Sequence, residues 1–194
     1  MKSYRLRTIV FLALCCDLGL FCKRLIAPAA NIITDFLHIP GGIGTSFSLM
    51  FLVIAASLVP KFGCASLMGA VQSLIALSLG MVGSMGALSP LGYIIPGLVI
   101  DILILLTGNG EMTRVSRTVL INAIAGCCSA LTANLIVFHL WGIPLLLYLS
   151  VAATSGSICG ILGAEIIRRV APVIGFSEKI SSRNREGGLK NEKK

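Results

Sequence analysis

Long apolar stretches separated by short polar ones run through most of the chain. A helix needs about 20 apolar residues to cross the hydrocarbon core of a bilayer, and somewhat fewer when its ends reach the interface. Six stretches fit this length, and the first and fourth are interrupted by proline or charged residues. The pattern therefore predicts an all-α bundle of six transmembrane helices. We place them at residues 7–29, 43–60, 63–82, 89–107, 118–139 and 143–170.

The composition supports this interpretation, because 56% of the residues are hydrophobic and only 12% are charged. The mean hydropathy of +0.93 lies far outside the range of soluble domains. No polar linker divides the helices, so we expect one transmembrane domain at residues 1–172 and a basic tail at 173–194. The tail has no interleaved aromatic residues and follows a membrane helix, which favours contact with membrane lipid and not with nucleic acid.

Most lysines and arginines lie on one side of the six-helix arrangement, whereas the opposite connections "GSMGAL" and "HLWGIP" contain neither residue. The positive-inside rule therefore places both termini in the cytoplasm. The residues on this side are Lys2, Arg5, Arg7, Lys61, Arg114, Arg117, Arg168, Arg169 and those of the tail. The basic start also resembles a signal peptide, but charges interrupt its apolar run, and we expect it to be retained as the first helix.

Lys23 and Arg24 depart from the charge rule, because they lie in the outer half of the first helix. A cation facing lipid at this depth is unfavourable, whereas an interior or interfacial one is tolerated. Two interpretations remain open. The side chains extend to the outer interface, or they provide a cationic lining for a cavity that opens outward.

Glycine and alanine recur at four-residue spacing in the sixth helix, at Gly156, Gly160 and Ala164. Small side chains on one face allow another helix to approach closely. The stripe is typical of packing within one bundle, and it also suits docking to a separate membrane partner.

Three acidic residues lie inside the expected helices. Glu165 is four residues before Arg169, a favourable helical pair that indicates a structural role. Asp17 is one heptad before Arg24 and could share a face with it. Asp101 lies about 12 Å deeper than Tyr93 at the helical rise, below any outward pocket. We expect Asp101 to hold its helix to a neighbour or to act in coupling, so that Asp101→Asn spares ligand binding and impairs assembly or uptake.

The outer connections supply hydrogen-bonding and aromatic groups to one end of the bundle. We interpret "NIITDFLHIPGGIGTSF" as a long connection that either gates a cavity or forms a plain turn. Together with nearby polar residues in the helices, these segments suit a binding pocket open to the outside. For each candidate the alternative is hydrogen bonding between helices or anchoring at the interface. The candidate residues are Asn31, His38, Ser48, Gln72, Ser89, Tyr93, Asn122 and Trp141.

Catalytic and metal-binding motifs are absent from the sequence. The seven cysteines have no CxxC spacing and suit apolar packing. The two histidines lie in outer connections, and no nucleophile motif or phosphate-binding GxxxxGK[ST] occurs. We therefore expect no enzyme activity, no cofactor and no metal.

The phrases "HIPGG", "VPKFG" and "LSPLGYIIPGLVID", in this order within residues 5–170, resemble the S-components of energy-coupling factor (ECF) transporters. The resemblance implies a multi-pass protein of a prokaryotic plasma membrane that binds a vitamin or cofactor precursor from outside. It also implies association with a transmembrane coupling protein and two cytoplasmic ATPase subunits. The stretch "AASLVPKFGCASLMGAVQSLIAL" is most similar to the subgroup for thiamine or its hydroxymethylpyrimidine precursor.

One part of the family pattern is not matched. The resemblance implies a docking face of alanines four apart on the first helix, but here Asp17 follows Ala13. The nearest substitute is Cys15 with Gly19.

Two other classes of function remain possible from the sequence. A self-sufficient small permease or channel could use buried Asp17 and Asp101 as ion or proton sites. A membrane enzyme or assembly factor would need a polar cluster at one depth, whereas the acids here are dispersed.

Overall fold

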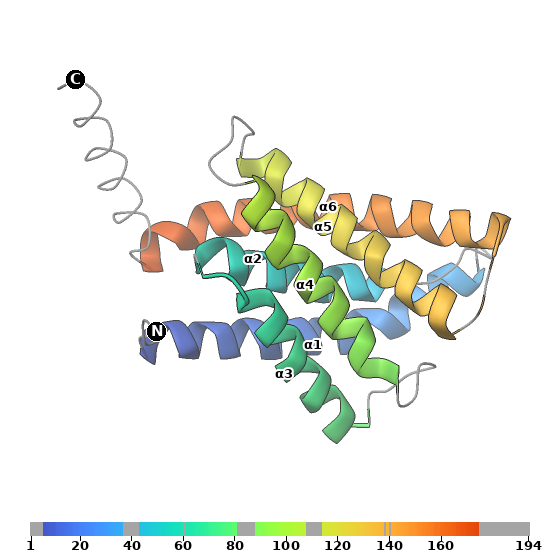
Figure 1. Cartoon of the computed structure of the whole chain (residues 1–194), viewed down its shortest axis with the longest axis horizontal. Coiled ribbons are helices and arrows are strands. Elements are labelled where there is room, and N and C mark those ends of the chain that lie inside the picture. Colours follow the sequence, from blue (N-terminus) through green and yellow to red (C-terminus); the bar gives the residue numbers. More distant parts are fainter. Residues whose placement is uncertain are drawn as a thin grey trace.

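The structure is a computed structural model that describes residues 6–36, 43–59, 61–80, 88–107, 114–137, 139 and 141–174. Six α-helices and one π-helical turn account for nearly all of these residues (Figure 1). The expectation of an all-α protein is therefore confirmed for the part that is described. The elements are α1 (Leu6–Phe36), α2 (Ile43–Leu58), α3 (Cys64–Ser78), α4 (Ser89–Thr107), α5 (Arg114–Thr132), η2 (Ala133–Val137) and α6 (Ile143–Ile174).

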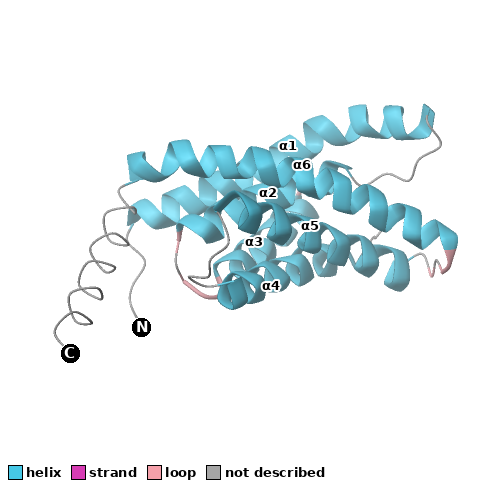
Figure 2. Ribbon diagram, turned by 90° about the horizontal axis from the view of Figure 1, so that it is seen from above, coloured by secondary structure: helices cyan, strands magenta, loops and turns pink. Residues whose placement is uncertain are grey.

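Helix α2 forms the centre of the bundle and packs against all five other α-helices. Its sequence is largely apolar, as expected of a surrounded helix, and Leu52, Val53 and Ala55 have no exposed surface. Figures 1 and 2 show α1, α2 and α6 running along the long axis, with α3, α4 and α5 crossing obliquely. Helix α1 begins at one end of the bundle, and α2 and α6 end there. We call this the N-terminal end and the opposite one the far end.

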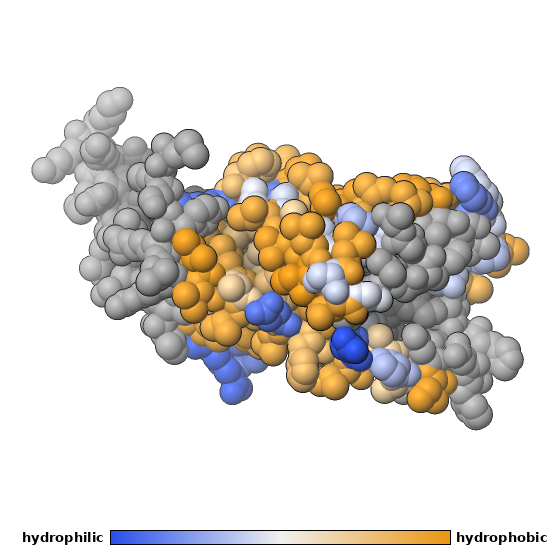
Figure 3. Space-filling model, turned by 90° about the horizontal axis from the view of Figure 1, so that it is seen from below, coloured by the Kyte–Doolittle hydropathy of each residue, from blue (hydrophilic) through white to orange (hydrophobic). Residues whose placement is uncertain are grey.

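Within the described residues, three helical segments are long and apolar enough to cross a membrane: Ser89–Thr107, Val115–Ile136 and Ile143–Ala171. Helices α2 and α3, of 16 and 15 residues, are apolar but shorter. Large apolar side chains are exposed on several helices, including Leu14, Leu106 and Ile143. Figure 3 shows one face of the molecule with mostly apolar described residues. This exterior suits a bilayer better than water.

The helix boundaries agree with the sequence in some places and differ in others. The expected helix at 89–107 is confirmed by α4, which contains Pro96 inside the helix. The interpretation of "NIITDF" as part of a connection is wrong, because α1 continues past Pro28 to Phe36. A proline removes one N–H from the helical ladder, and the bonds on either side of it remain. The last residues of the same stretch, 43–47, belong to α2.

Helices α5 and α6 pack through the glycines of α6. A Cβ atom on Gly156 would lie 2.9 Å from Ala123 Cα, and one on Gly160 would lie 2.6 Å from Val119 Cα. Ala164 is also buried. The stripe Gly156, Gly160 and Ala164 is therefore used inside the bundle. Its two glycines lie directly against the backbone of α5.

Helices α3 and α4 cross through a second pair of glycines. A Cβ atom on Gly69 would lie 2.5 Å from the carbonyl oxygen of Tyr93, and one on Gly97 would lie 2.8 Å from that of Ala65. Only residues without a side chain allow the two backbones to approach this closely. The crossing fixes the position of Tyr93 relative to α3.

Candidate functional site

Lys23 of α1 and Tyr93 of α4 meet in the half of the bundle nearer the far end. The Lys23 Nζ donates a hydrogen bond of 2.9 Å to the Tyr93 hydroxyl oxygen. The same nitrogen lies 4.4 Å from the centroid of the tyrosine ring, within the range of a cation–π interaction. The Tyr93 ring is buried, whereas the lysine side chain is half-buried. This pair joins α1 to α4 through residues that are 70 positions apart in the chain.

The tyrosine is held in place from two sides. Its ring packs with Leu20 and Ala76 in a small apolar cluster, and its backbone lies against Gly69 of α3. Leu20 is three residues before Lys23, so both lie on the face of α1 that meets α3 and α4. The phenol therefore has a fixed position beside the ammonium group.

Gln72 and Ser48 lie about one helical turn deeper, around Gly19. The Gln72 Nε2 donates a hydrogen bond of 3.1 Å to the Cys16 carbonyl oxygen, and it would be 2.8 Å from a Cβ atom on Gly19. The carbonyl oxygen of Ser48 would be 3.4 Å from that same atom. The Ser48 hydroxyl is buried and has no hydrogen-bond partner within the described ranges.

Ser89 is the first residue of α4 and is buried. It lies one turn before Tyr93 on the same face of the helix. The structure thus brings Ser48, Gln72, Ser89 and Tyr93 to the region where α1, α2, α3 and α4 meet, and it adds Lys23 to them. We call this region the α1–α4 junction.

Asn122 lies elsewhere, on the seam between α5 and α6. Its Nδ2 donates a hydrogen bond of 2.8 Å to the Gly156 carbonyl oxygen, while its Oδ1 is buried without a partner among the residues described. On the same seam, the hydroxyl groups of Ser46 and Ser155 are 2.9 Å apart. The seam holds α2, α5 and α6 together, and Asn122 is part of that packing.

The remaining candidates are not brought to the junction by the described structure. Trp141 is 75% exposed in the connection between α5 and α6, as an interfacial anchor would be. Asn31 lies in the helical backbone of α1, but its side chain is outside the described residues, and so is all of His38.

Asp101 has a clear structural role. Its Oδ1 accepts a hydrogen bond of 3.1 Å from the backbone N–H of Ala65, and its Oδ2 accepts one of 2.8 Å from the backbone N–H of Ser66. The Ser66 hydroxyl donates to the same Oδ2 at 2.5 Å. The carboxylate therefore caps the N-terminus of α3, where free N–H groups and the helix dipole favour negative charge. The neighbour that Asp101 holds is α3.

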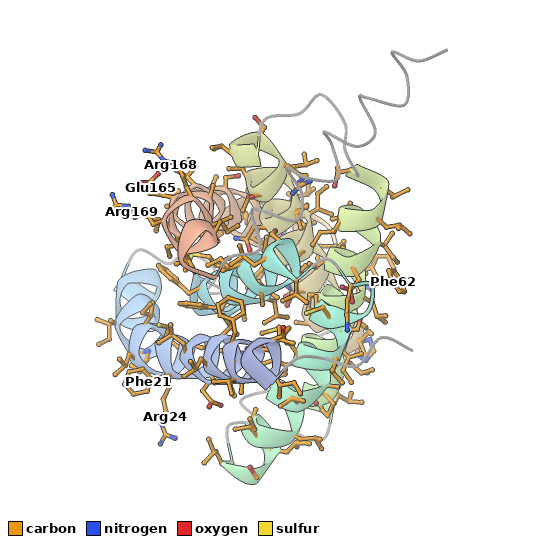
Figure 4. The ribbon with its side chains drawn as sticks, turned by 90° about the vertical axis from the view of Figure 1, so that its left-hand side faces the viewer. Phe21, Arg24, Phe62, Glu165, Arg168 and Arg169 are labelled. Atoms are coloured by element: carbon orange, nitrogen blue, oxygen red, sulfur yellow. The ribbon has the colours of Figure 1, made fainter. Side chains whose placement is uncertain are left out.

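The acidic residues at the surface behave differently from Asp101. Asp17 is exposed on α1, so the expectation that it is buried is wrong. Arg24 and Phe21 point away from the bundle, as Figure 4 shows. Glu165 pairs with Arg169 at 3.0 Å and with Arg168 at 3.7 Å on the outside of α6. The substitute docking pair Cys15 and Gly19 is buried and faces inward.

Two polar residues were absent from the candidates. Lys23 was recognisable from the charge pattern, as a cation on the wrong side of the positive-inside rule. Asn134 lies in the π-helical turn η2 and is buried, with its Oδ1 unpartnered in the described part of the chain. Short π-helical segments often occur at functional sites, but nothing in the sequence distinguishes this one from regular helix.

The groups at the junction are of the kinds that bind small molecules. The junction offers an ammonium group, a phenol and an amide at fixed positions. Among the residues described, Tyr93 is the one titratable group within hydrogen-bonding distance of Lys23. Nor does any group of three or more His, Cys, Asp or Glu in the described ranges have the arrangement of a metal site.

Comparison with known proteins does not place the chain in a family. No protein-family model, no curated protein and no solved structure matches it.

Proposed function

We propose that this protein is a substrate-capture subunit of an ECF-type transporter. It binds a small polar vitamin or cofactor precursor, with thiamine-related compounds favoured by the resemblance of the sequence. The observation that carries the proposal is the α1–α4 junction, where Lys23, Gln72, Ser89 and Tyr93 are gathered toward the far end. Sites of this kind, largely apolar with a few fixed polar groups, are typical of small-molecule binding.

The distribution of charge supports an outward orientation of this junction. Lys61 lies between α2 and α3, and Arg168 and Arg169 lie near the finish of α6, all toward the N-terminal end. In a six-span arrangement the positive-inside rule then puts this end and both termini in the cytoplasm of a prokaryotic cell. The far end, and the junction near it, face the outside.

The surface of α1 supports association with a membrane partner. Asp17 lies exposed among the exposed apolar side chains of Leu14, Leu18 and Phe21. An acidic group facing lipid near the middle of a spanning helix costs about 2.5–3.5 kcal/mol on the insertion scale. A transmembrane coupling protein, itself driven by two cytoplasmic ATPases, would cover this group and remove most of that cost.

The alternative of a self-sufficient permease or channel receives less support. It requires acidic residues that line a path through the protein. Asp17 is on the outside of α1, and the Asp101 carboxylate is engaged by three donors of α3.

Ligand binding by the purified protein tests the proposal directly. We expect submicromolar affinity for at least one of radiolabelled thiamine, hydroxymethylpyrimidine, riboflavin, biotin, pantothenate or nicotinate, measured on the protein in phosphatidylcholine nanodiscs. Binding of none of these compounds or their phosphate esters would contradict the proposal. Uptake into liposomes that contain this protein alone would favour the permease.

Asp17→Leu tests the partner surface. We expect the variant to retain ligand binding. When all subunits are co-expressed, the amount of coupling protein and ATPase that purifies with the variant should fall at least about 10-fold. The reason is the loss of one favourable charged contact of about 1.5–3 kcal/mol. Glu165→Leu is the matched control, since its carboxylate pairs within α6. Equal recovery with Asp17→Leu and Glu165→Leu would show that the partner does not contact this face of α1.

A further inference from the structure

Lys23 carries a positive charge for which the described residues supply no negative partner. Lys23 takes no part in the ion pairs that Glu165 forms with Arg168 and Arg169. The contacts of Lys23 are the hydroxyl and the ring of Tyr93, which are both uncharged. A cation removed from water without a counter-ion is unfavourable, so such groups are usually paired.

The hydrogen-bonding groups of the pair point to the kind of partner that is missing. An ammonium group has three donors and no acceptor. One of them is used on the Tyr93 oxygen at 2.9 Å. Because that oxygen accepts from lysine, the phenolic O–H remains available to donate to another atom. Two N–H groups of Lys23 and the O–H group of Tyr93 are thus left as donors on adjacent atoms.

The neighbouring Arg24 shows that a cation at this level of α1 does not need to face inward. Arg24 is exposed and extends away from the bundle (Figure 4). Lys23, one residue earlier, is turned toward α4 and reaches a buried tyrosine. Extension to the interface therefore accounts for Arg24 and does not account for Lys23.

We propose that Lys23 and Tyr93 bind an anionic oxygen group, a carboxylate or a phosphate, of the captured small molecule. This inference rests on the proposed function and specifies its substrate class. Charge-assisted hydrogen bonds from an ammonium and a phenol to one anion are short and strong. Free thiamine is a cation and is disfavoured beside Lys23. Among thiamine-related compounds, the phosphate esters of thiamine and of hydroxymethylpyrimidine fit the site better.

Matched pairs of compounds that differ only in the anionic group test the inference. The pairs are thiamine with its monophosphate, hydroxymethylpyrimidine with its monophosphate, nicotinamide with nicotinate, and panthenol with pantothenate. We expect wild-type protein in phosphatidylcholine nanodiscs to prefer the anionic member of at least one pair. The phosphate and carboxylate pairs show which anion is bound.

Substitutions then assign the preference to the two residues. Lys23→Met is expected to weaken binding of the anionic member by about 10- to 100-fold, as for loss of a hydrogen bond between charged groups. Binding of the neutral member should change by less than about twofold. Lys23→Arg should retain most of the preference for the anionic member. Tyr93→Phe should weaken binding of the anionic member by about 3- to 10-fold, because it removes one hydrogen bond from a neutral donor to the anion. Arg24→Met is the matched control and should leave both affinities unchanged.

The outcomes separate this inference from the proposed function. If wild-type protein binds none of the compounds, the capture function itself is contradicted. If it binds a compound and Lys23→Met weakens the charged and neutral members equally, Lys23 has only a structural role and the inference fails. Loss of the wild-type preference on adding phosphatidylglycerol to the nanodiscs would assign the site to lipid headgroups. Should Lys23→Met not fold, as judged by its thermal midpoint, Lys23→Arg and Tyr93→Phe decide the question.

Discussion

Asp101→Ala is expected to lower the free energy of unfolding by about 3–5 kcal/mol, the range measured when one partner of a buried charged network is removed. The carboxylate accepts from the N–H groups of Ala65 and Ser66 and from the Ser66 hydroxyl. Without it, two N–H groups at the start of α3 lose their partners in a region from which water is excluded. The loss should appear as a lower thermal midpoint and a lower midpoint of unfolding by sodium dodecyl sulfate, both in detergent micelles.

Asp17→Ala is the control for Asp101→Ala, because Asp17 is exposed on α1. Because it removes a charge from a lipid-facing position, it should not lower the same midpoints. Asp101→Asn keeps one acceptor oxygen and should lie between the two alanine variants. Impaired assembly or uptake by Asp101→Asn would then follow from a weakened joint between α3 and α4. Equal stability of Asp101→Ala and Asp17→Ala would contradict the capping role.

Gly160→Ala should destabilise the packing of α5 on α6 by about 1–3 kcal/mol, the usual cost of overfilling a well-packed region. The added methyl group would lie 2.6 Å from Val119 Cα and 3.2 Å from the Thr118 carbonyl oxygen. Both atoms belong to the backbone, so the steric overlap can be removed only if the whole of α5 moves away from α6. Thermal unfolding in detergent measures the change.

Gly163→Ala is the matched control on the same helix. Its methyl group would lie 3.0 Å from Met50 Cγ, in a flexible side chain that can shift. Alanine is also favoured over glycine in a helix by about 1 kcal/mol. We expect this variant to be neutral or slightly more stable than wild type. The same loss from both variants would show that overfilling at the α5–α6 contact is not the cause.

The helical architecture could be predicted from the sequence because it depends on properties that are local. Apolar runs of nearly 20 residues and the proline and glycines of "SPLGYIIPGLVIDIL" gave the bounds of α4 correctly. The same local reasoning fails after Pro28, where the polar residues predict a connection although α1 continues to Phe36. Polarity alone does not end a helix when its backbone bonds can continue on both sides of a proline.

The candidate site could be predicted only in part, because it depends on which helix faces meet. Tyr93 and Gln72 were recognisable as polar groups in apolar helices, but their depth and partners follow from the glycine contacts of Gly69 and Gly19. Asn122 has the same kind of sequence environment and lies on the α5–α6 seam. Lys23 differs from Arg24 only in its direction around α1, which a rotation of 100° per residue sets once the packing of the helix is known.

Because the Asp101 cap ties α3 to α4, it also determines which helices of the bundle separate most easily. Pulling α3 from α4 would break three hydrogen bonds to one carboxylate and open two contacts between glycine and backbone. The contact of α1 with α3 is much less extensive, and the interactions of α1 with the α3–α4 pair include the bonds from Gln72 to Cys16 and from Lys23 to Tyr93. We therefore expect α3 and α4 to stay together, and if the protein takes up a small molecule as proposed, we expect the bundle to open along the seam beside α1, where contacts with this pair are few.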